Sequence, residues 1–284
     1  MKTLIINADD VGLSSEINEA VRKCYFENVI TGVSLLACGD GFEDAVEMLK
    51  SIGKTSVGVH LVLTGSFKPC TKDFSSIRSL LPGGKFASGY QGLTSRYFMG
   101  KISASEVYTE FSAQLKKVKD AGLEVTHLDS HEHIHMLPDV LEAVVKLAVD
   151  FDIPYVRLPR EDTCVVKKKF SPKDLLRHAG LKVFAAQAER VMSITGVQHN
   201  DVFWGHFHSG RIDDNVLCFI VSNLAEGMNE LAVHPGVLSA ELVKRSYWHR
   251  NAQKEMEALL RGRWKDLLAE EGVCLVTHSE AVDV

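Results

Sequence analysis

Two segments of the sequence place carboxylate and imidazole side chains next to apolar runs. Asp9 and Asp10 are adjacent and follow the apolar residues 4–6. Neighbouring carboxylates repel, so such a pair is stable only if a cation shares the charge or one carboxyl stays protonated. His60 lies inside the apolar segment 57–62. Alone, the aspartates could cap a turn or helix and His60 could be a core histidine; together they indicate a metal site.

The densest group of such residues is the segment 127–135, in which His or Asp occupies every odd position. If the segment is extended, its two-residue period places all five on one face. Each would cost roughly a few kcal/mol in an apolar core without a hydrogen-bond partner. The letters from His131 to His135 also spell H-E-x-x-H, but that metalloprotease motif requires a helix, whereas the preceding residues are strand-like. We therefore favour a metal or catalytic site built on a strand end.

One carboxylate and two imidazoles would leave coordination positions open, which is typical of a catalytic metal site. A metal held in this way activates water and polarises a carbonyl, so hydrolysis needs no covalent intermediate. A second carboxylate beside the metal can act as general base, and a histidine across the site as general acid. The sequence contains no G-x-S-x-G, G-x-G-x-x-G or Walker A motif.

Short Val-, Ile- and Leu-rich runs alternate with stretches of helical period from end to end, which predicts an α/β fold around a parallel sheet. We expect a distorted or incomplete (β/α) barrel, with a doubly wound sheet as the alternative. The expected strands are 3–8, 33–37, 56–62, 125–129, 154–158, 202–206, 231–234 and 273–277. Ionisable residues gather at their carboxyl ends, where such folds build active sites. Besides the residues above, these are Arg157, His206, His208, His234 and His278.

The expected helices begin with one after Ser14 or Ser15, whose apolar stripe follows the helical period. The others are near 42–51, 105–121, 138–148, 213–224 and 245–270. We expect a single domain, 1–284, because no composition break marks a linker. Two segments depart from the alternation, 65–102 and 159–196, and we expect both insertions to shape a substrate cleft.

Composition is that of a soluble globular protein, with 45% hydrophobic and 24% charged residues. The net charge of -5 gives no reason to expect nucleic acid as a partner. The six cysteines form no C-x-x-C pair, so we expect reduced thiols rather than a disulfide framework. No signal sequence or membrane span is recognisable, and we expect a cytoplasmic protein without stable membrane insertion.

The sequence resembles the YdjC-like carbohydrate deacetylases, which include chitooligosaccharide deacetylase. Four motifs carry the resemblance in the family's order: 7–12 (NADDVG), 58–61 (GVHL), 126–135 (THLDSHEHIH) and 233–236 (VHPG). It extends over nearly the whole chain. The resemblance implies a barrel like that of polysaccharide deacetylases and removal of an acetyl group from an N-acetylated amino sugar. By motif position it implies Asp10, His60 and His131 as metal ligands, Asp9 as base and His234 as acid.

The family is usually described with magnesium, whereas two histidines and one carboxylate suit zinc better, so one divalent ion, Mg²⁺ or Zn²⁺, is expected. Arg157 has two candidate roles, a catalytic one toward the substrate or oxyanion and a structural ion pair. The segment 155–161 resembles the branch of the family associated with hopanoid biosynthesis. The expected substrate is therefore an acetylated oligosaccharide or a lipid-linked acetylated sugar. A homodimer is expected by analogy with related barrels.

Two other readings remain open at this point. The metal site could hydrolyse another bond, a phosphoester or a peptide. The chain could also be a sugar-binding barrel without catalytic activity, although the carboxylates and imidazoles of the four motifs argue against it. Trp204 and Trp248 could stack on sugar rings or pack in the core.

Overall fold

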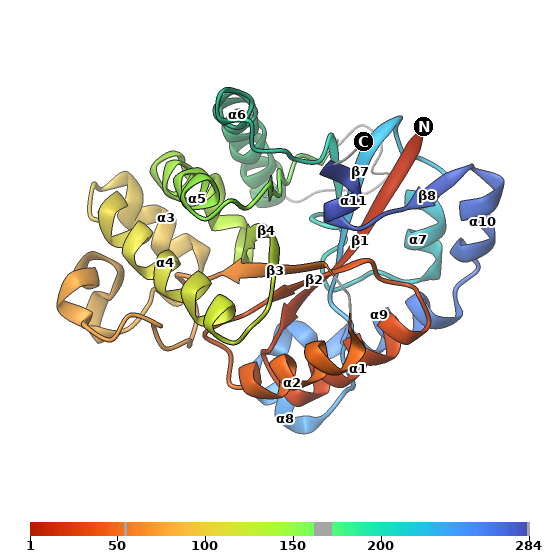
Figure 1. Cartoon of the computed structure of the whole chain (residues 1–284), viewed down its shortest axis with the longest axis horizontal. Coiled ribbons are helices and arrows are strands. Elements are labelled where there is room, and N and C mark those ends of the chain that lie inside the picture. Colours follow the sequence, from red (N-terminus) through yellow and green to blue (C-terminus); the bar gives the residue numbers. More distant parts are fainter. Residues whose placement is uncertain (54–55, 162–171, 283–284) are drawn as a thin grey trace.

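The computed structural model describes residues 1–53, 56–161 and 172–282. In these residues, parallel strands form one curled sheet, a half-barrel surrounded by helices (Figure 1). The strand order is β5-β4-β3-β2-β1-β7-β6, with β8 also paired to β1. The strands are β1 (Lys2–Val11), β2 (Gly32–Leu35), β3 (Ser56–Leu61), β4 (Val125–Ser130), β5 (Tyr155–Val156), β6 (Val202–Trp204), β7 (Gly227–Val233) and β8 (Val273–Leu275). The predicted α/β incomplete barrel and its eight strands are confirmed.

Strand β1 is the centre of the sheet and is buried on both faces. Its residues Leu4, Ile5 and Ile6 have no solvent exposure, which explains why the strand reads as a continuous apolar run rather than an alternating one. It pairs with β7 along most of its length. On the other edge, β2 pairs with the carboxyl half of β1 and β8 with its first residues.

Helices surround the half-barrel, as Figure 1 shows. They are α1 (Ser15–Phe26), α2 (Phe42–Ile52), α3 (Tyr90–Phe98), α4 (Ala104–Asp120), α5 (Pro138–Asp150), α6 (Pro172–Thr195), α7 (Asp214–Val221), α8 (Ala240–Arg245), α9 (Ala252–Arg261), α10 (Trp264–Glu270) and α11 (His278–Val282). The predicted stripe of α1 is confirmed, since Ile17, Ala20 and Val21 are fully buried. The described residues also form four short 3-10 helices, which are η1 (Phe74–Leu80), η2 (Pro82–Gly84), η3 (His131–Met136) and η4 (Tyr247–Asn251).

The expected single helix over 245–270 is wrong, because the chain there forms η4, α9 and α10 in succession. The break between α9 and α10 falls at Gly262, whose backbone is extended. A Cβ atom at this position would lie 2.4 Å from the carbonyl oxygen of Ala258, so only glycine fits without a shift. The separate η4 turn carries Trp248 and His249.

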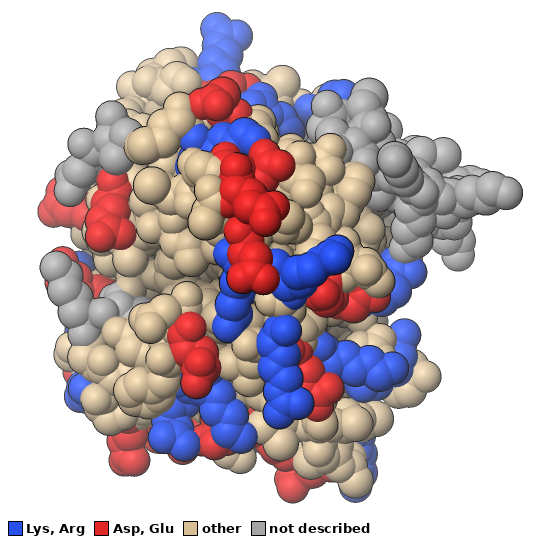
Figure 2. Space-filling view, turned by 90° about the vertical axis from the view of Figure 1, so that its right-hand side faces the viewer, with Lys and Arg blue, Asp and Glu red and all other residues tan. Residues whose placement is uncertain are grey.

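The first expected insertion, 65–102, contains η1, η2 and α3, and the described part of the second contains α6. Residues 162–171, which include Cys164 and the basic run 167–169, lie outside the described residues. Within the described ranges, no helix is both long enough and apolar enough to cross a bilayer. On the face shown in Figure 2, basic and acidic side chains are interspersed.

Candidate metal and catalytic site

The carboxyl end of β1 directs two adjacent carboxylates into one pocket. In a regular strand, Asp9 and Asp10 would point to opposite faces of the sheet. The register between β1 and β2 shifts between Ala8 and Val11, and Asp10 has a φ of 59°, in the left-handed region that aspartate tolerates better than most residues. This bulge lets both carboxylates line the same pocket.

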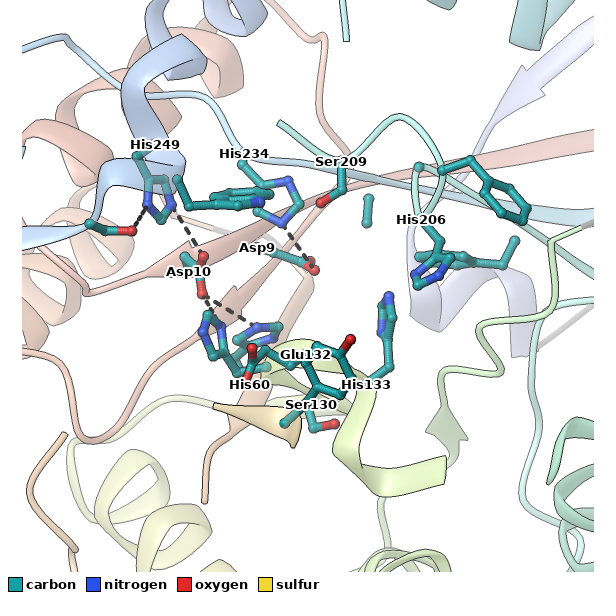
Figure 3. A pocket seen from close by; sticks show the side chains of 18 of the residues that line it. Asp9, Asp10, His60, Ser130, Glu132, His133, His206, Ser209, His234 and His249 are labelled. Atoms are coloured by element: carbon teal, nitrogen blue, oxygen red, sulfur yellow. Dashed lines mark hydrogen bonds and ion pairs between the residues drawn. The ribbon is translucent and has the colours of Figure 1, made fainter. Parts of the chain in front are cut away.

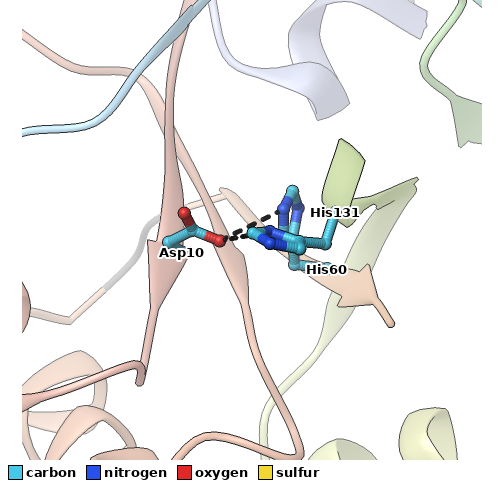
Figure 4. Close-up of side chains that lie close together, drawn as sticks. All are labelled: Asp10, His60 and His131. Carbon is cyan, nitrogen blue, oxygen red and sulfur yellow. Dashed lines mark hydrogen bonds and ion pairs between the residues drawn. The ribbon is translucent and has the colours of Figure 1, made fainter. Parts of the chain in front are cut away.

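Asp10, His60 and His131 come together at the floor of this pocket, from β1, β3 and the residue that follows β4 (Figure 4). Asp10 Oδ1 lies 2.9 Å from His131 Nδ1 and 3.4 Å from His60 Nε2. One candidate ligand atom from each residue lies within 4.8 Å of the others. Because parallel strands end at one edge, residues far apart in sequence meet there, and their types match a divalent metal site.

Two further residues fix the orientation of this triad. His60 Nδ1 contacts Asp129 Oδ1 at 2.9 Å, which leaves Nε2 facing Asp10. A carboxylate on the far nitrogen of a histidine is the usual outer support of a metal ligand. On the other side, His249 Nε2 lies 3.2 Å from Asp10 Oδ2, and its Nδ1 contacts Ser246 Oγ at 2.8 Å.

His249 is a functional candidate that sequence reasoning missed. Its side chain is 2% exposed and reaches Asp10 from η4, far along the chain. The segment reads as part of a helix, and no local pattern separates this histidine from a surface one. Only the break of that helix and the packing of η4 against the end of β1 place it here.

Asp9 is held as an anion by Arg157. Arg157 Nη1 and Nη2 donate to the two oxygens of Asp9 at 2.7 and 2.8 Å, and Asn7 donates to Oδ1. Burial by itself raises the pKa of Asp9, but Arg157 above all, together with His60 and His234, outweighs burial and lowers the pKa from 3.8 to about 2. Asp9 is therefore ionised throughout the neutral range.

Arg157 is fully buried and does not line the pocket. Its guanidinium pairs with Asp9, Asp129 and Glu230, which together use its fork of donors. The contacts therefore match the structural ion pair, the second of the two roles considered for this residue. Through its ion pairs with Asp9 and Asp129, Arg157 holds in place two carboxylates next to the candidate ligands.

His234 lies directly after β7, across the pocket from the triad (Figure 3). Its Nε2 is 3.9 Å from Asp9 Oδ2, and its Nδ1 is 3.8 Å from Glu255 Oε1. Burial lowers the pKa of His234, but Glu255, Asp9 and Asp10 raise it by more, so the net pKa lies above its usual value. An anionic carboxylate and an imidazole that favours its protonated form thus face the same cavity.

The expectation that all five odd positions of 127–135 share one face is wrong. The strand ends at Ser130, and η3 follows with Glu132 and His133 at positive φ, so the two-residue period stops there. His127 is buried away from the pocket. His135 Nε2 contacts the carbonyl of Arg157 at 2.9 Å, so it faces away from the triad and the H-E-x-x-H match is a coincidence, as the strand context predicted.

The expected place of His278 at the same rim is also wrong. Strand β8 pairs only with Lys2–Leu4, near the start of β1, so its end reaches the interior of the barrel rather than the carboxyl edge. His278 is fully buried there and stacks on His127 with ring centroids 3.4 Å apart. Its ring also contacts Ser56 Oγ at 3.1 Å.

The pocket above the triad has a volume of about 450 Å³. Trp248 forms part of its wall and is 37% exposed, with its ring centroid 4.4 Å from that of His234. Trp204, by contrast, is 3% exposed and donates to Asn229, so it is a core residue. Tyr90 brings the first insertion into the wall, whereas the described residues of the second contribute no lining side chain. The other walls come from His133, Phe203, His206, Phe207, Ser209 and Arg211.

Fold and site together define an α/β half-barrel protein with a cluster of candidate metal ligands at the carboxyl edge of its sheet. The chain belongs to the family of YdjC-like proteins, whose model matches residues 3–270. A carbohydrate deacetylase of Brevibacillus brevis is 30% identical, with 98% of each chain covered. A chitooligosaccharide deacetylase of Salmonella paratyphi B is 25% identical, covering 95% of this chain and 96% of its own.

The fold also matches a solved structure. A protein of Enterococcus faecalis V583, described as a candidate cellobiose-phosphate cleavage protein, superposes with a TM-score of 0.78 and 23% identity over 98% of both chains. The half-barrel is therefore the fold of a known structure along its whole length.

Proposed function

We propose that this protein is a metal-dependent hydrolase that removes the acetyl group from an N-acetylated amino sugar. The observation that carries the proposal is the convergence of Asp10, His60 and His131 beside Asp9 and His234 in one pocket. Membership of the YdjC-like family, with relatives named carbohydrate and chitooligosaccharide deacetylase, supports the substrate class.

The residues present fit one divalent ion. Asp10 supplies a carboxylate, and its contacts with two buried or half-buried imidazoles bring three donors to one point. A bound ion supplies Lewis acidity to the acetyl carbonyl and to the attacking water. Two nitrogens and one oxygen favour zinc or another transition metal over magnesium, which prefers an all-oxygen shell.

Asp9 is our candidate for the general base. It lines the pocket next to the triad, and Arg157 fixes its plane through two hydrogen bonds. Because the pKa of Asp9 is about 2, it accepts a proton only from a strongly acidified water. Asp9 can therefore act as the base only if the neighbouring ligands hold a metal ion that acidifies the water.

His234 is our candidate for the general acid. It faces Asp9 across the cavity, and its raised pKa favours the protonated imidazole. In that state it can donate a proton to the departing amine. Arg157 acts as a positioning residue, since it is fully buried and touches the carboxylate rather than the cavity.

The proposed substrate site is the cavity of about 450 Å³, a size typical of a small-molecule site. The partly exposed ring of Trp248 offers an apolar face next to His234, which suits the face of a pyranose. Both a free oligosaccharide and a lipid-linked sugar present such a ring, so both belong in the first assay.

The experiment is acetate release from N-acetylglucosamine oligomers and acetylated glycolipids, with metal-stripped protein and added zinc, cobalt, manganese or magnesium. We expect release that depends on added metal, and no change in an oligosaccharide without acetyl groups. The variant Asp9→Asn should lose turnover and keep bound metal. Stoichiometric metal binding without acetate release would instead favour hydrolysis of another bond, such as a phosphoester or peptide.

We also propose a cytoplasmic location and a homodimeric assembly. The first draws support from the spacing of the six cysteines, which form no C-x-x-C pair and no disulfide framework. Sedimentation of the purified protein at several concentrations tests the second, and a constant monomer mass would contradict it.

A further inference from the structure

Two cysteines lie side by side at the carboxyl edge of the sheet, outside the pocket described above. Cys38 belongs to the segment between β2 and α2, and Cys70 to the loop that follows β3. Their Sγ atoms are 3.2 Å apart, and both side chains are half-buried. The residues are distant in sequence, so the contact is made by the fold.

Helix α4 holds both loops in place. Lys117 Nζ donates to the carbonyl of Ala37 at 2.7 Å, next to Cys38. Seven residues earlier on the helix, Glu110 accepts the backbone N–H groups of Cys70 and Thr71 at 2.9 and 3.1 Å. The two thiols are therefore brought together by backbone anchors that do not depend on the thiols themselves.

We propose that Cys38 and Cys70 form a thiol–disulfide pair that closes by exchange with a small-molecule disulfide. A disulfide bond requires an S–S distance of about 2.05 Å, so the sulfurs must approach by about 1.1 Å. Rotation of the two half-buried side chains would close this gap while the backbone anchors stay in place. Elsewhere in the described chain the cysteines differ: Cys24 is fully buried, Cys218 contacts Asp214, and Cys274 is exposed.

The exchange balances with a disulfide such as oxidised glutathione as the oxidant. The thiolate of one cysteine attacks a sulfur of the small disulfide, forms a mixed disulfide and releases one glutathione thiolate, which takes up a proton. The second cysteine then attacks the protein sulfur of the mixed disulfide and expels the other glutathione. Two protein thiols are oxidised, one disulfide is reduced to two thiols, and the two protons pass to the glutathione thiolates.

The bond would join two loops at the rim of the site. The Cys70 loop also carries Phe67, whose ring packs edge-on against His131 with centroids 5.8 Å apart. Closing the pair thus ties the loop that covers one side of the triad to the segment after β2. This inference concerns thiol chemistry and stands whether or not the protein is a deacetylase.

A soft metal ion is the competing occupant of this cluster, because Glu110 Oε1 lies 4.0 Å from Cys38 Sγ. Two observations favour the disulfide. Both oxygens of Glu110 already accept hydrogen bonds, from Cys70, Thr71 and Gln114. The sulfurs are also closer together than two thiolates on one tetrahedral zinc ion, which lie roughly 3.8 Å apart at Zn–S distances of about 2.3 Å.

The test is incubation of the reduced, metal-stripped full chain with oxidised glutathione, followed by alkylation and peptide mass spectrometry. We expect a cross-linked peptide pair containing Cys38 and Cys70, with neither of these two cysteines alkylated. The closed loop spans about 30 residues, so the melting temperature should rise by about 5 °C and return with dithiothreitol.

Single substitutions make the outcome specific. Cys38→Ser and Cys70→Ser should each stop at a mixed disulfide and show no melting shift, whereas Cys218→Ser should cross-link like the parent chain. The proposal is wrong if the parent chain yields no Cys38–Cys70 peptide. It is also wrong if added zinc protects both thiols from alkylation and no cross-link forms after the zinc has been removed.

Discussion

Two groups of ionisable residues share the interior of this half-barrel, and they differ in what neutralises them. Around Arg157, the carboxylates Asp129 and Glu230 are fully buried and paired with a guanidinium that is also fully buried. Around Asp10, the histidines come from separate elements of the fold, and His131 keeps 26% of its side chain exposed to the pocket. The charges of the first group are neutralised by other groups of the protein, whereas the second group faces a cavity.

The difference separates a structural cluster around Arg157 from a potentially reactive cluster around Asp10. Buried charges persist only where partners match them, so the Arg157 cluster is a source of rigidity. Convergent donors at a cavity leave room for an ion, a water and a substrate. Asp9 belongs to both groups, since it binds Arg157 and lines the pocket. The following predictions test whether the two groups can be changed independently.

The largest expected effect is on activity, from the variant Asp10→Asn. Loss of the carboxylate should remove the metal and lower kcat/KM by about 1,000-fold or more, because several kcal/mol of charge stabilisation disappear. Steady-state kinetics and metal content by mass spectrometry measure the two effects. Asp266→Asn, on an exposed turn of α10, is the control and should match the parent. Full metal content with full activity in Asp10→Asn would remove Asp10 from the ligand set.

The next effect is on stability, from Arg157→Met. Three buried carboxylates would lose their shared cation, and the free energy of unfolding should fall by about 5 kcal/mol or more. Urea unfolding measures the change. The matched control is Arg160→Met, whose partner Glu189 and guanidinium are both partly exposed, and it should cost about 1 kcal/mol or less. Equal costs for the two variants would mean that the buried cluster is not a support.

Acidification should weaken the Arg157 cluster gradually. Burial raises the pKa of Glu230, but Arg157 and His278 outweigh it and lower the pKa from 4.5 to about 2, and the pKa of Asp9 also falls to about 2. Both groups stabilise the fold fully above pH 4.5 and lose that contribution as the pH drops toward 2. The shifts correspond to roughly 2.5 kcal/mol for Asp9 and roughly 3.5 kcal/mol for Glu230.

Urea unfolding at pH values between 5 and 3 measures this decline. Glu230→Gln should be less stable than the parent at pH 7 and should lose less stability on acidification, since one of the two titrating groups is gone. A decline of the same size in both proteins would show that Glu230 does not titrate with a lowered pKa.

The smallest expected effect is on substrate affinity, from Trp248→Ala. Loss of a stacking face is worth about 1 kcal/mol, so KM should rise about fivefold with kcat nearly unchanged. Tyr247→Ala is the neighbouring control, because Tyr247 is 70% exposed and does not line the pocket. A fall in kcat with constant KM would assign Trp248 to the support of His234 instead.

Much of the fold could be predicted because it follows from local patterns. The apolar runs mark strands that the sheet buries on both faces, and the stripe of α1 marks its packed side. The predictions were wrong where a local sequence pattern continued beyond the residue at which the backbone conformation changes. The alternation of 127–135 stops at Ser130, and the helical period after 245 is interrupted before Ala252 and again at Gly262.

The sequence by itself determined the strand order along the chain, the types of side chain at the strand ends and the four family motifs. It did so because hydrophobic period and residue type are local properties. Only the tertiary structure decided that His249 and Trp248 reach the pocket, that His278 does not, and that Cys38 meets Cys70. These depend on where each turn packs against the sheet, and that position is set by contacts between residues that no local pattern connects.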